Sequence, residues 1–273
     1  LTLSVGGFAA AAQNPVQAAV GNALDASVWQ ASGDYAAVMN ALALLNTSQA
    51  QPVLTALSGM NYSGLSNSIV QGAQLFMSNF QAQAGGNTRQ GNRIALAAAC
   101  DTACDATQPG LWGAWGGAQG GVGTVGASQP LGGVTYNLGG FAGGLDRRFG
   151  ENFLAGVALG YTTGTQWVSG FTSQSSTNTV QFGLYGSYTQ GPAYLDGLAG
   201  YAYTSSQTSR SIAIPGLSPR TAVGMAGVNQ LFGQVEGGWR FDIGTAAQAY
   251  VTPFARVQAS GGMQGAFSEN GAQ

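Results

Sequence analysis

From residue 111 onward, hydrophobic and polar positions alternate with a period of two, as in a β-strand whose two faces meet different environments. The segment 153–162 shows the alternation most clearly. One face carries Phe153, Ala155, Val157, Leu159 and Tyr161, and the other carries Leu154, Gly156, Ala158, Gly160 and Thr162. In the preceding strand, Gly140 and Gly144 share a face with Asp146. Glycine and a carboxylate do not suit a soluble core, so this face indicates a barrel wall whose lumen leaves room for something.

The alternation predicts seven antiparallel strands and the start of an eighth. The expected strands are Leu111–Gly120, Val134–Arg148, Phe153–Thr163, Thr179–Thr189, Ala193–Thr204, residues 231–242 and Ala249–Ala259, with the eighth beginning near Met263. Short links at Gly150, Gly191-Pro192 and Gly244-Thr245 alternate with longer polar stretches such as Trp167–Thr177 and Ser205–Ala222. Short turns at one rim and long loops at the other are typical of outer-membrane barrels, with the short turns on the periplasmic side.

Aromatic residues gather near the ends of these strands. They are Tyr161, Tyr188, Tyr201, Tyr203, Trp239 and Phe241. This position suits the aromatic girdles that flank the lipid-facing band of a membrane barrel. The alternative is that they are ordinary aromatics of a β-core.

The first 84 residues follow a helical period instead. The expected helices are Pro15–Ala31, Asp34–Leu45, Gln49–Leu57 and Leu65–Gln83, the first with Asn14 as its N-cap and Pro15 at its first position. Apolar faces formed by Leu42 and Leu45, and by Ile69, Ala73, Phe76 and Phe80, indicate helices that pack on one another. A short strand is expected over Leu1–Gly7, and Thr88–Ala99 has helical character.

The composition favours a membrane protein of the β type. Charged residues make up 7% of the 273 residues, against ~25% in typical soluble domains, and the 45 Gly are roughly twice the usual share. The mean hydropathy is only +0.09, and no run of about 18 apolar residues predicts a transmembrane helix. Low charge with alternating apolar positions fits a membrane β-barrel. The formal net charge of −2 gives no electrostatic reason to expect a nucleic-acid partner.

Motifs for catalysis or cofactor binding are weak. The chain has no His, which excludes histidine-based triads and the usual zinc sites. Residues 121–126 match GxGxxG, but Pro130 follows where a dinucleotide site needs a helix, so we expect no cofactor and no enzyme. Cys100 and Cys104 make a poor metal pair, whereas their i, i+4 spacing favours a disulfide in an oxidising compartment.

Six stretches of the second half, taken in order, resemble the translocator domain of bacterial autotransporters, the type V secretion proteins. They are LWGAW at 111–115, GFAGGLD at 140–146, GVALGY at 156–161, YLDG at 194–197, EGGWRF at 236–241 and FSENGA at 267–272. In the first half, NPVQAAV at 14–20 and ALSG at 56–59 are similar to the segment that such proteins carry between passenger and barrel.

The resemblance implies a mainly β fold: an antiparallel, up-and-down transmembrane β-barrel of a 12-stranded family, preceded by an α-helical linker region. Residues 1–13 would end the passenger's β-structure, 14–84 would be the linker, 85–110 would hold a lumen-threading helix and connector, and 111–273 would be the barrel. The inward Gly140, Gly144, Gly156 and Gly160 would leave room for that helix. A 12-stranded barrel needs roughly 240 residues, so we expect an incomplete barrel of seven or eight strands from a longer protein.

Five charges are predicted to face the lumen: Asp146, Glu236, Arg240, Arg256 and Glu269. Under the resemblance they would pair with Arg89, Arg93 or Asp101, or with one another, hold the helix and set the conductance of the pore. The alternative is that they are generic, solvated lumen lining. No adjacent Asn pair occurs in the expected lumen helix, so self-cleavage of the kind some family members perform is not indicated.

The expected function is that of an outer-membrane translocator that exports its own N-terminal passenger and anchors it at the cell surface. Its expected partners are outer-membrane lipid, the barrel-assembly machinery, periplasmic chaperones and its own passenger. Two alternatives stay open. The helical region and long loops could form a surface adhesin anchored by the barrel, or the barrel could be a small-solute porin.

Overall fold

The computed structural model describes residues 7–86, 94–95, 111–127, 132–171, 173–243 and 249–271, and its largest element is an antiparallel sheet. Along the sheet the strands are β1 (Ile94–Ala95), β2 (Trp112–Val125), β3 (Val134–Phe149), β4 (Phe153–Val168), β5 (Ser173–Gln190), β6 (Ala193–Ile212), β7 (Arg220–Trp239) and β10 (Phe254–Gln264). β11 (Glu269–Asn270) also pairs with β7, and β8 (Phe241–Asp242) and β9 (Tyr250–Val251) form a small separate hairpin.

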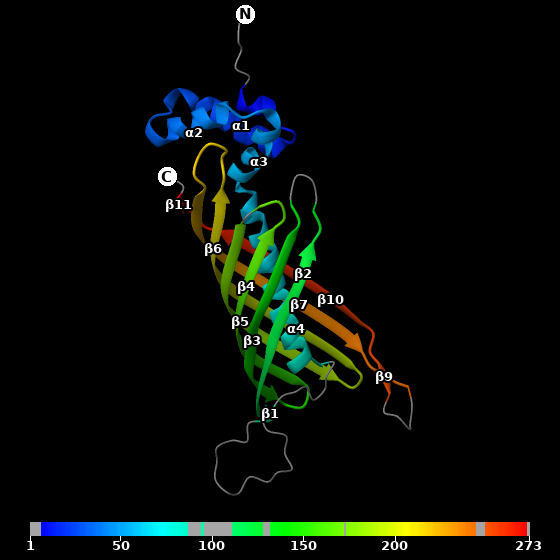
Figure 1. Ribbon diagram of the computed structural model, residues 1–273. Coiled ribbons are helices and arrows are strands. Elements are labelled where there is room, and N and C mark those ends of the chain that lie inside the picture. The colour runs from blue at the N-terminus through cyan, green and yellow to red at the C-terminus, as the bar shows by residue number, and fades with distance from the viewer. Residues whose placement is uncertain are drawn as a thin grey trace, which may run out of the picture.

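The long strands pair with their neighbours in chain order, so the sheet is of the up-and-down type, and it curls around one helix (Figure 1). Among the described strands, β2 and β10 do not pair with each other, and the curled sheet stays open between them. The predicted faces are confirmed: Val157, Leu159 and Tyr161 are exposed on the outside, whereas Ala158 and Thr162 are buried inside.

The eighth strand differs from its prediction. Met263 belongs to β10, and the later strand is the two-residue β11, which pairs with Gly224 and Val223 of β7. Two strand-to-strand turns are described at one rim, and in each a glycine adopts positive φ, Gly150 at 67° and Gly191 at 56°, as Gly does readily. We call this edge the turn rim and the opposite edge the cap rim. The expected link at Gly244-Thr245 lies outside the described residues.

The strands extend further toward the cap rim than their sequence suggested. The stretches Trp167–Thr177 and Ser205–Ala222, expected as long loops, are mostly strand, because β4 ends at Val168, β5 begins at Ser173 and β6 runs to Ile212. Their inward side chains satisfy one another in pairs: Thr179 with Thr204 at 2.8 Å, and Ser175 with Thr208 at 2.8 Å. Such cross-strand hydrogen bonds let a polar sequence continue a sheet.

A helical cap sits over this rim. It consists of η1 (Phe8–Ala11), α1 (Pro15–Ser27), η2 (Val28–Gln30), α2 (Gly33–Ala43) and α3 (Thr47–Leu57). The predicted N-cap of α1 is confirmed, since Asn14 accepts a hydrogen bond from the backbone N–H of Gln17. The expected strand over Leu1–Gly7 lies outside the described residues except for Gly7, and residues 8–11 of the expected passenger end form a 3₁₀ helix.

The helix inside the sheet is α4 (Ser63–Ala84), which follows η3 (Gly59–Tyr62) and contacts β2 through β7 and β10. This corrects the assignment of the lumen helix to Thr88–Ala99: within that range Ile94–Ala95 pair with β2 as strand β1, and the remainder lies outside the described residues. It also corrects the expected helix-on-helix packing of Phe76 and Phe80, because a helical period shows that one face is buried and not what buries it. No helix within the described ranges combines the length and hydropathy that crossing a membrane requires.

The outer face of the sheet is an apolar band. Its exposed side chains include Phe141, Leu145, Val157, Leu159, Val180, Phe182, Leu184, Leu195, Leu231 and Val235. Tyr161, Tyr201 and Tyr203 edge the band toward the cap rim, and Phe149, Phe153, Tyr188 and Trp239 edge it toward the turn rim, all of them exposed. An apolar belt between two aromatic girdles is the lipid-facing surface of an outer-membrane barrel. The alternative of ordinary core aromatics is excluded by their exposure.

Candidate functional site: a helix-filled lumen

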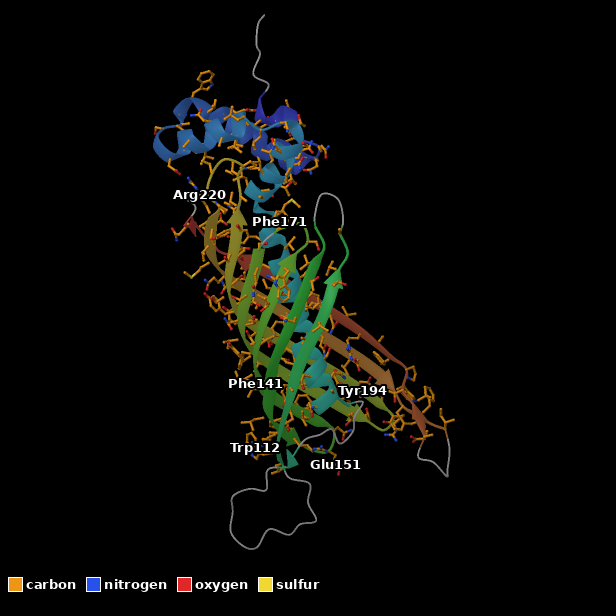
Figure 2. The ribbon with its side chains drawn as sticks, viewed as in Figure 1. Trp112, Phe141, Glu151, Phe171, Tyr194 and Arg220 are labelled. Carbon is orange, nitrogen blue, oxygen red and sulfur yellow. The ribbon has the colours of Figure 1, made fainter. Side chains whose placement is uncertain are left out.

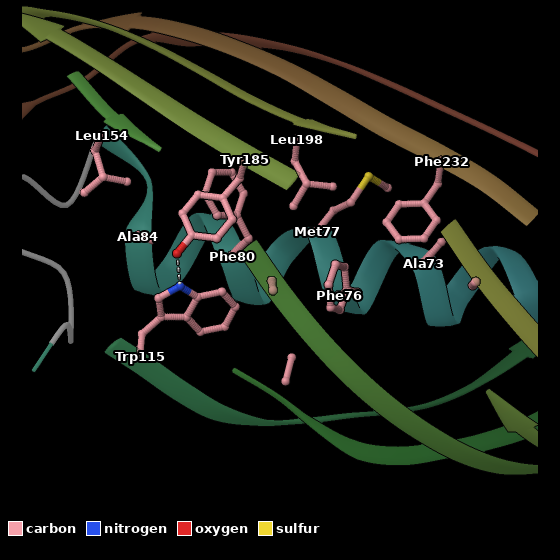
Figure 3. Packing of buried hydrophobic residues seen from close by; sticks show 13 residues of the cluster. Ala73, Phe76, Met77, Phe80, Ala84, Trp115, Leu154, Tyr185, Leu198 and Phe232 are labelled. Carbon is pink, nitrogen blue, oxygen red and sulfur yellow. Dashed lines mark hydrogen bonds between the residues drawn. The ribbon is translucent and has the colours of Figure 1, made fainter. Parts of the chain in front are cut away.

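The middle of the lumen is an apolar contact between α4 and the inner face of the sheet. Ala73, Phe76, Met77, Phe80 and Ala84 of the helix meet inward side chains of six strands (Figure 3). The inward side chains are Trp115, Ala142, Leu154, Ala158, Tyr185, Leu198, Ala202 and Phe232. Phe76 and Phe80 are fully buried, and Phe76 meets Phe232 edge-on with ring centroids 5.6 Å apart. The helix therefore occupies the lumen as a packed core element.

Inward glycines give these aromatic rings their space. A Cβ at Gly160 would come within 2.7 Å of the Phe76 ring, so this glycine admits the helix directly. At Gly144 the same atom would lie 2.5 Å from the ring of Trp115, and at Gly156 it would lie 2.6 Å from the ring of Tyr185. Those two glycines accommodate inward aromatics of the wall.

Gly140 has a different reason to be small. A Cβ there would lie 2.0 Å from the carbonyl oxygen of Tyr161 on the neighbouring strand. Of the four glycines predicted to face the lumen, Gly160 is thus the one that contacts α4.

Toward the turn rim, the end of α4 is held by two buried carboxylates. Gln81 donates from Nε2 to Glu236 Oε1 (2.9 Å) and to Asp196 Oδ2 (2.7 Å). The backbone N–H of Gly86, just beyond the helix, also donates to Asp196, at 2.8 and 3.0 Å from its two oxygens. One helix side chain and one backbone amide therefore connect α4 to β6 and β7.

Glu236 is satisfied on every side. Its Oε1 also accepts from Tyr194 Oη at 2.7 Å, and its Oε2 forms an ion pair with Arg256 of β10. Glu236 is 1% exposed, so leaving this carboxylate unpaired would carry a large desolvation cost. The predicted inward positions of Glu236 and Arg256 are where the structure places them, and their partners are each other.

Asp146 ends a chain of hydrogen bonds between side chains of the barrel wall. Trp115 donates from Nε1 to Tyr185 Oη (2.8 Å), and Tyr185 donates to Asp146 Oδ2 (2.9 Å), as the dashed line to Tyr185 in Figure 3 shows for the first bond. Asp146 is 1% exposed. The Tyr185 ring also packs on Phe80 of α4, with ring centroids 4.8 Å apart. Asp146 therefore fixes the orientation of a side chain that contacts the helix.

Between the apolar centre and the Arg210–Glu269 pair at the cap rim, the described side chains that hold α4 are polar and uncharged. Gln119 donates to Thr162 Oγ1 (2.7 Å) and Gln181 Oε1 (3.2 Å), and Gln181 donates to the backbone carbonyl of Gly72 on α4 (2.9 Å). Ser68 of α4 is hydrogen-bonded to Gln166 of β4. Amide and hydroxyl groups both donate and accept, so they fix the helix without an ion pair.

Two predicted lumen charges lie at the rims, Glu269 on the inward face opposite Gly224 and Arg240 near the strand turns. Glu269 sits at the cap rim, beyond the apolar band, where it forms an ion pair with Arg210 and accepts from Tyr62 Oη (2.8 Å). Burial raises the pKa of Glu269, but the hydrogen bonds from Arg210 and Tyr62 and the charge of Arg210 together lower it below its ordinary value. Arg240 lies at the turn rim, where it bonds Asp242 and stacks over the Tyr250 ring at 3.8 Å.

The remaining predicted residues cannot be placed. Arg89, Arg93, Asp101, Cys100 and Cys104 lie outside the described residues. Sequence reasoning missed Gln81, Tyr194 and Asp196 as parts of the site. Asp196 alternates with the exposed Leu195, so its inward position was readable from the period of β6, whereas the role of Gln81 depends on α4 being in the lumen.

A sheet with a lipid-facing band and a lumen filled by the preceding helix defines an outer-membrane translocator. A family model described as the autotransporter beta-domain matches residues 114–273. The chain therefore belongs to the autotransporter family, which confirms the resemblance found in the sequence. Neither the curated proteins nor the solved structures compared with the chain gave a match.

Proposed function

We propose that this chain exports its own N-terminal passenger across the outer membrane and anchors it at the cell surface. The observation that carries the proposal is the path of the chain: the cap lies at one rim, α4 runs through the lumen, and the chain reaches the turn rim before the sheet begins. If the passenger had passed through the barrel, the segment between passenger and barrel would remain inside the lumen. α4 occupies that position. In this proposal, residues 1–13 end the passenger, 14–84 form the helical linker with α4, and 85–110 connect to the barrel of 111–273.

The proposed orientation places the cap rim outside the cell and the turn rim in the periplasm, because outer-membrane barrels have short periplasmic turns. Figure 2 shows the two rims, with Trp112 and Glu151 at one and Phe171 and Arg220 at the other. Insertion would need the barrel-assembly machinery, periplasmic chaperones and outer-membrane lipid, as the family implies. No catalytic turnover is assigned to this part of the protein.

The packing of α4 favours a translocator over a small-solute porin. A porin lumen is an aqueous channel, whereas here Phe76 and Phe80 are fully buried against the wall. The adhesin alternative has one observation in its favour: Trp29 and Leu44 of the cap are 92% and 86% exposed. Loss of surface binding on replacing these two residues, with export intact, would support it.

The test is to express the complete reading frame in a Gram-negative host and to examine the outer-membrane fraction. We expect a species whose gel mobility shifts on boiling and whose cap is cleaved by protease added to intact cells. The control is the same gel on cells opened before protease, which exposes the turn rim as well. A soluble protein without a heat shift would rule out the membrane function, and a heat shift with a protected cap would reverse the orientation.

A further inference from the structure

On the outer wall, between the lipid-facing band and the cap, lies a shallow hollow of about 710 Å³. It crosses the ends of four strands and is lined by Trp167, Gln174, Ser176, Gln207, Ser209 and Thr221, among others. The register aligns these side chains in rows: Trp167 faces Gln174, Gln174 faces Ser209, and Ser176 faces Gln207. The hollow is open to solvent, so it would cover one face of a ligand and would not enclose it.

The hollow stands clear of the lipid. Trp167 follows Tyr161, which edges the apolar band, by six residues of the same strand. At about 3.3 Å per residue this is roughly 20 Å along β4, or about 15 Å above the band for a strand tilted by about 40°. The outward positions around the hollow are mixed: Ser205 and Asn178 are exposed and polar, whereas Met225, which pairs with Gln207, is exposed and apolar. A tryptophan at this height is too far out to serve as a girdle anchor.

The chemistry of the lining selects a neutral, hydroxyl-rich ligand. None of the described residues that line the hollow is charged, and the nearby Arg210 and Arg220 form ion pairs with Glu269 and Asp34. Amide and hydroxyl side chains donate and accept alike, as a sugar hydroxyl requires of its partners. Trp167, which is 40% exposed, adds a flat apolar surface of the kind that covers the C–H face of a pyranose ring.

The site is longer than one sugar unit. A second hollow of about 380 Å³ lies between α3 and the tip of the β6–β7 hairpin, and it shares Phe171 and Ser211 with the first. Phe171 lies at the β4–β5 turn on the cap side of the sheet (Figure 2), and it lines the second hollow together with Pro52 and Ala56 of α3. The two hollows together form one trough from the wall to the underside of the cap, with an aromatic residue in each part.

We propose that this trough binds the oligosaccharide of the outer-leaflet glycolipid that surrounds the barrel. The inference rests on the orientation given under the proposed function, since only that orientation places the trough outside the cell. The glycolipid is favoured over a free glycan because the trough opens on the outer wall directly above the lipid-facing band, where the sugar portion of such a lipid stands. Bound there, the sugar would link the cap and the barrel wall to the membrane surface.

The test uses the full chain folded in detergent and, as probe, the neutral part of the core oligosaccharide of rough lipopolysaccharide, freed of phosphate and of its acidic sugar, with binding followed by calorimetry. We expect saturable binding that Trp167→Ala weakens by about tenfold and Gln207→Ala by a few fold. Trp112→Ala is the matched control, because Trp112 is also exposed on the outer wall but at the turn rim, and it should bind as the parent does. The heat-dependent gel shift establishes that each variant is folded. If Trp167→Ala does not fold, the result for Gln207→Ala decides the test.

Absence of saturable binding by the parent would overturn the proposal, as would equal weakening by Trp167→Ala and Trp112→Ala. Binding of only the phosphorylated oligosaccharide would also overturn it, since the trough offers no free cation among its described lining residues. Because the assay is done in detergent, its result does not depend on export. Failure of the proposed function would show instead in the protease test on intact cells.

Discussion

The helix inside the sheet and the helices above it are held by different means. α4 packs along one side against the wall: its aromatics are fully buried, and both its ends are hydrogen-bonded to the wall. The cap rests on a single hairpin. Met39, Leu42 and Val53 of the cap pack on Ile212, Ile214 and Ala222 at the tip of β6 and β7.

The polar contacts of the cap are few by comparison. Arg220 pairs with Asp34, and Arg210 donates to the carbonyl oxygen of Ala56 at 2.7 Å. The Asp34 carboxylate is exposed, so solvent screens that pair. The same run of helices therefore contains one part held along the barrel wall and one part held at a single hairpin, with the boundary near η3.

Truncation of the central aromatic should give the largest effect. Phe76→Ala removes a fully buried ring and leaves a cavity between α4 and Phe232, for which we expect a loss of about 3–5 kcal/mol in the free energy of unfolding. The measurement is the urea concentration at which the unboiled gel band disappears. Val70→Ala, on the exposed side of the same helix, is the control and should cost about 1 kcal/mol or less. Equal losses would mean that α4 does not pack as described.

Loss of the buried carboxylate should rank second. Glu236→Gln leaves Arg256 without its counter-charge, and we expect a loss of about 3 kcal/mol, at the low end for a broken buried pair because Arg256 is 27% exposed. Glu151→Gln, in an exposed turn, should change nothing measurable. The double variant Glu236→Gln, Arg256→Gln should recover part of the loss. Simple additivity of the two single losses would show that the pair is not coupled.

A substitution in the interface between the cap and the β6–β7 hairpin should destabilise the cap without destabilising α4. Ile212→Ala shortens a side chain that is 5% exposed and should weaken docking of the cap by about 2 kcal/mol. Hydrogen exchange of α2 and α3 should rise, whereas that of α4 and the heat-dependent gel shift should stay as in the parent. Leu44→Ala, at a position 86% exposed on the cap, is the control. Faster exchange throughout α4 would mean that the cap and α4 form one cooperative unit.

Acid should give the smallest effect, again at the cap rim. The pKa of Glu269 is lowered in the folded protein, so its stabilisation is fully present above its ordinary value of 4.5 and is lost as pH falls through the lowered pKa. We expect a loss of about 1 kcal/mol or less, because the pair is partly solvated. Exchange of the cap at pH 3 compared with pH 6 measures it. The Glu269→Gln variant should show no such pH dependence from this site, and an unchanged slope would assign the effect to another group.

The wall of the barrel was predictable from sequence because its information is local. A period of two fixes which residues face the lumen, and Asp146, Glu236 and the inward glycines followed from it directly. The extension toward the cap rim was not predictable in the same way. Stretches such as Ser173–Thr179 have the composition of a loop, and only pairing with an equally long neighbour makes them strand.

The content of the lumen could not be predicted, because it depends on contacts between residues far apart in the chain. The face of Phe76 and Phe80 indicates burial without naming the partner, and Gln81 meets Glu236 across 155 residues. The pair of Glu269 with Arg210 likewise joins two strand ends that are neighbours only through β7. Charges could be listed from sequence, but their partners required the fold.

One property of α4 has an electrical consequence. Its 22 residues contain no Asp, Glu, Lys or Arg, and at about 1.5 Å per residue the helix spans roughly 33 Å, the thickness of the membrane. A voltage does work of about 2.3 kcal/mol per 100 mV on each unit charge that crosses it, and the side chains of α4 offer none. The side chains of α4 therefore contribute no gating charge, and a transmembrane voltage couples to this helix only through the partial charges at its two ends.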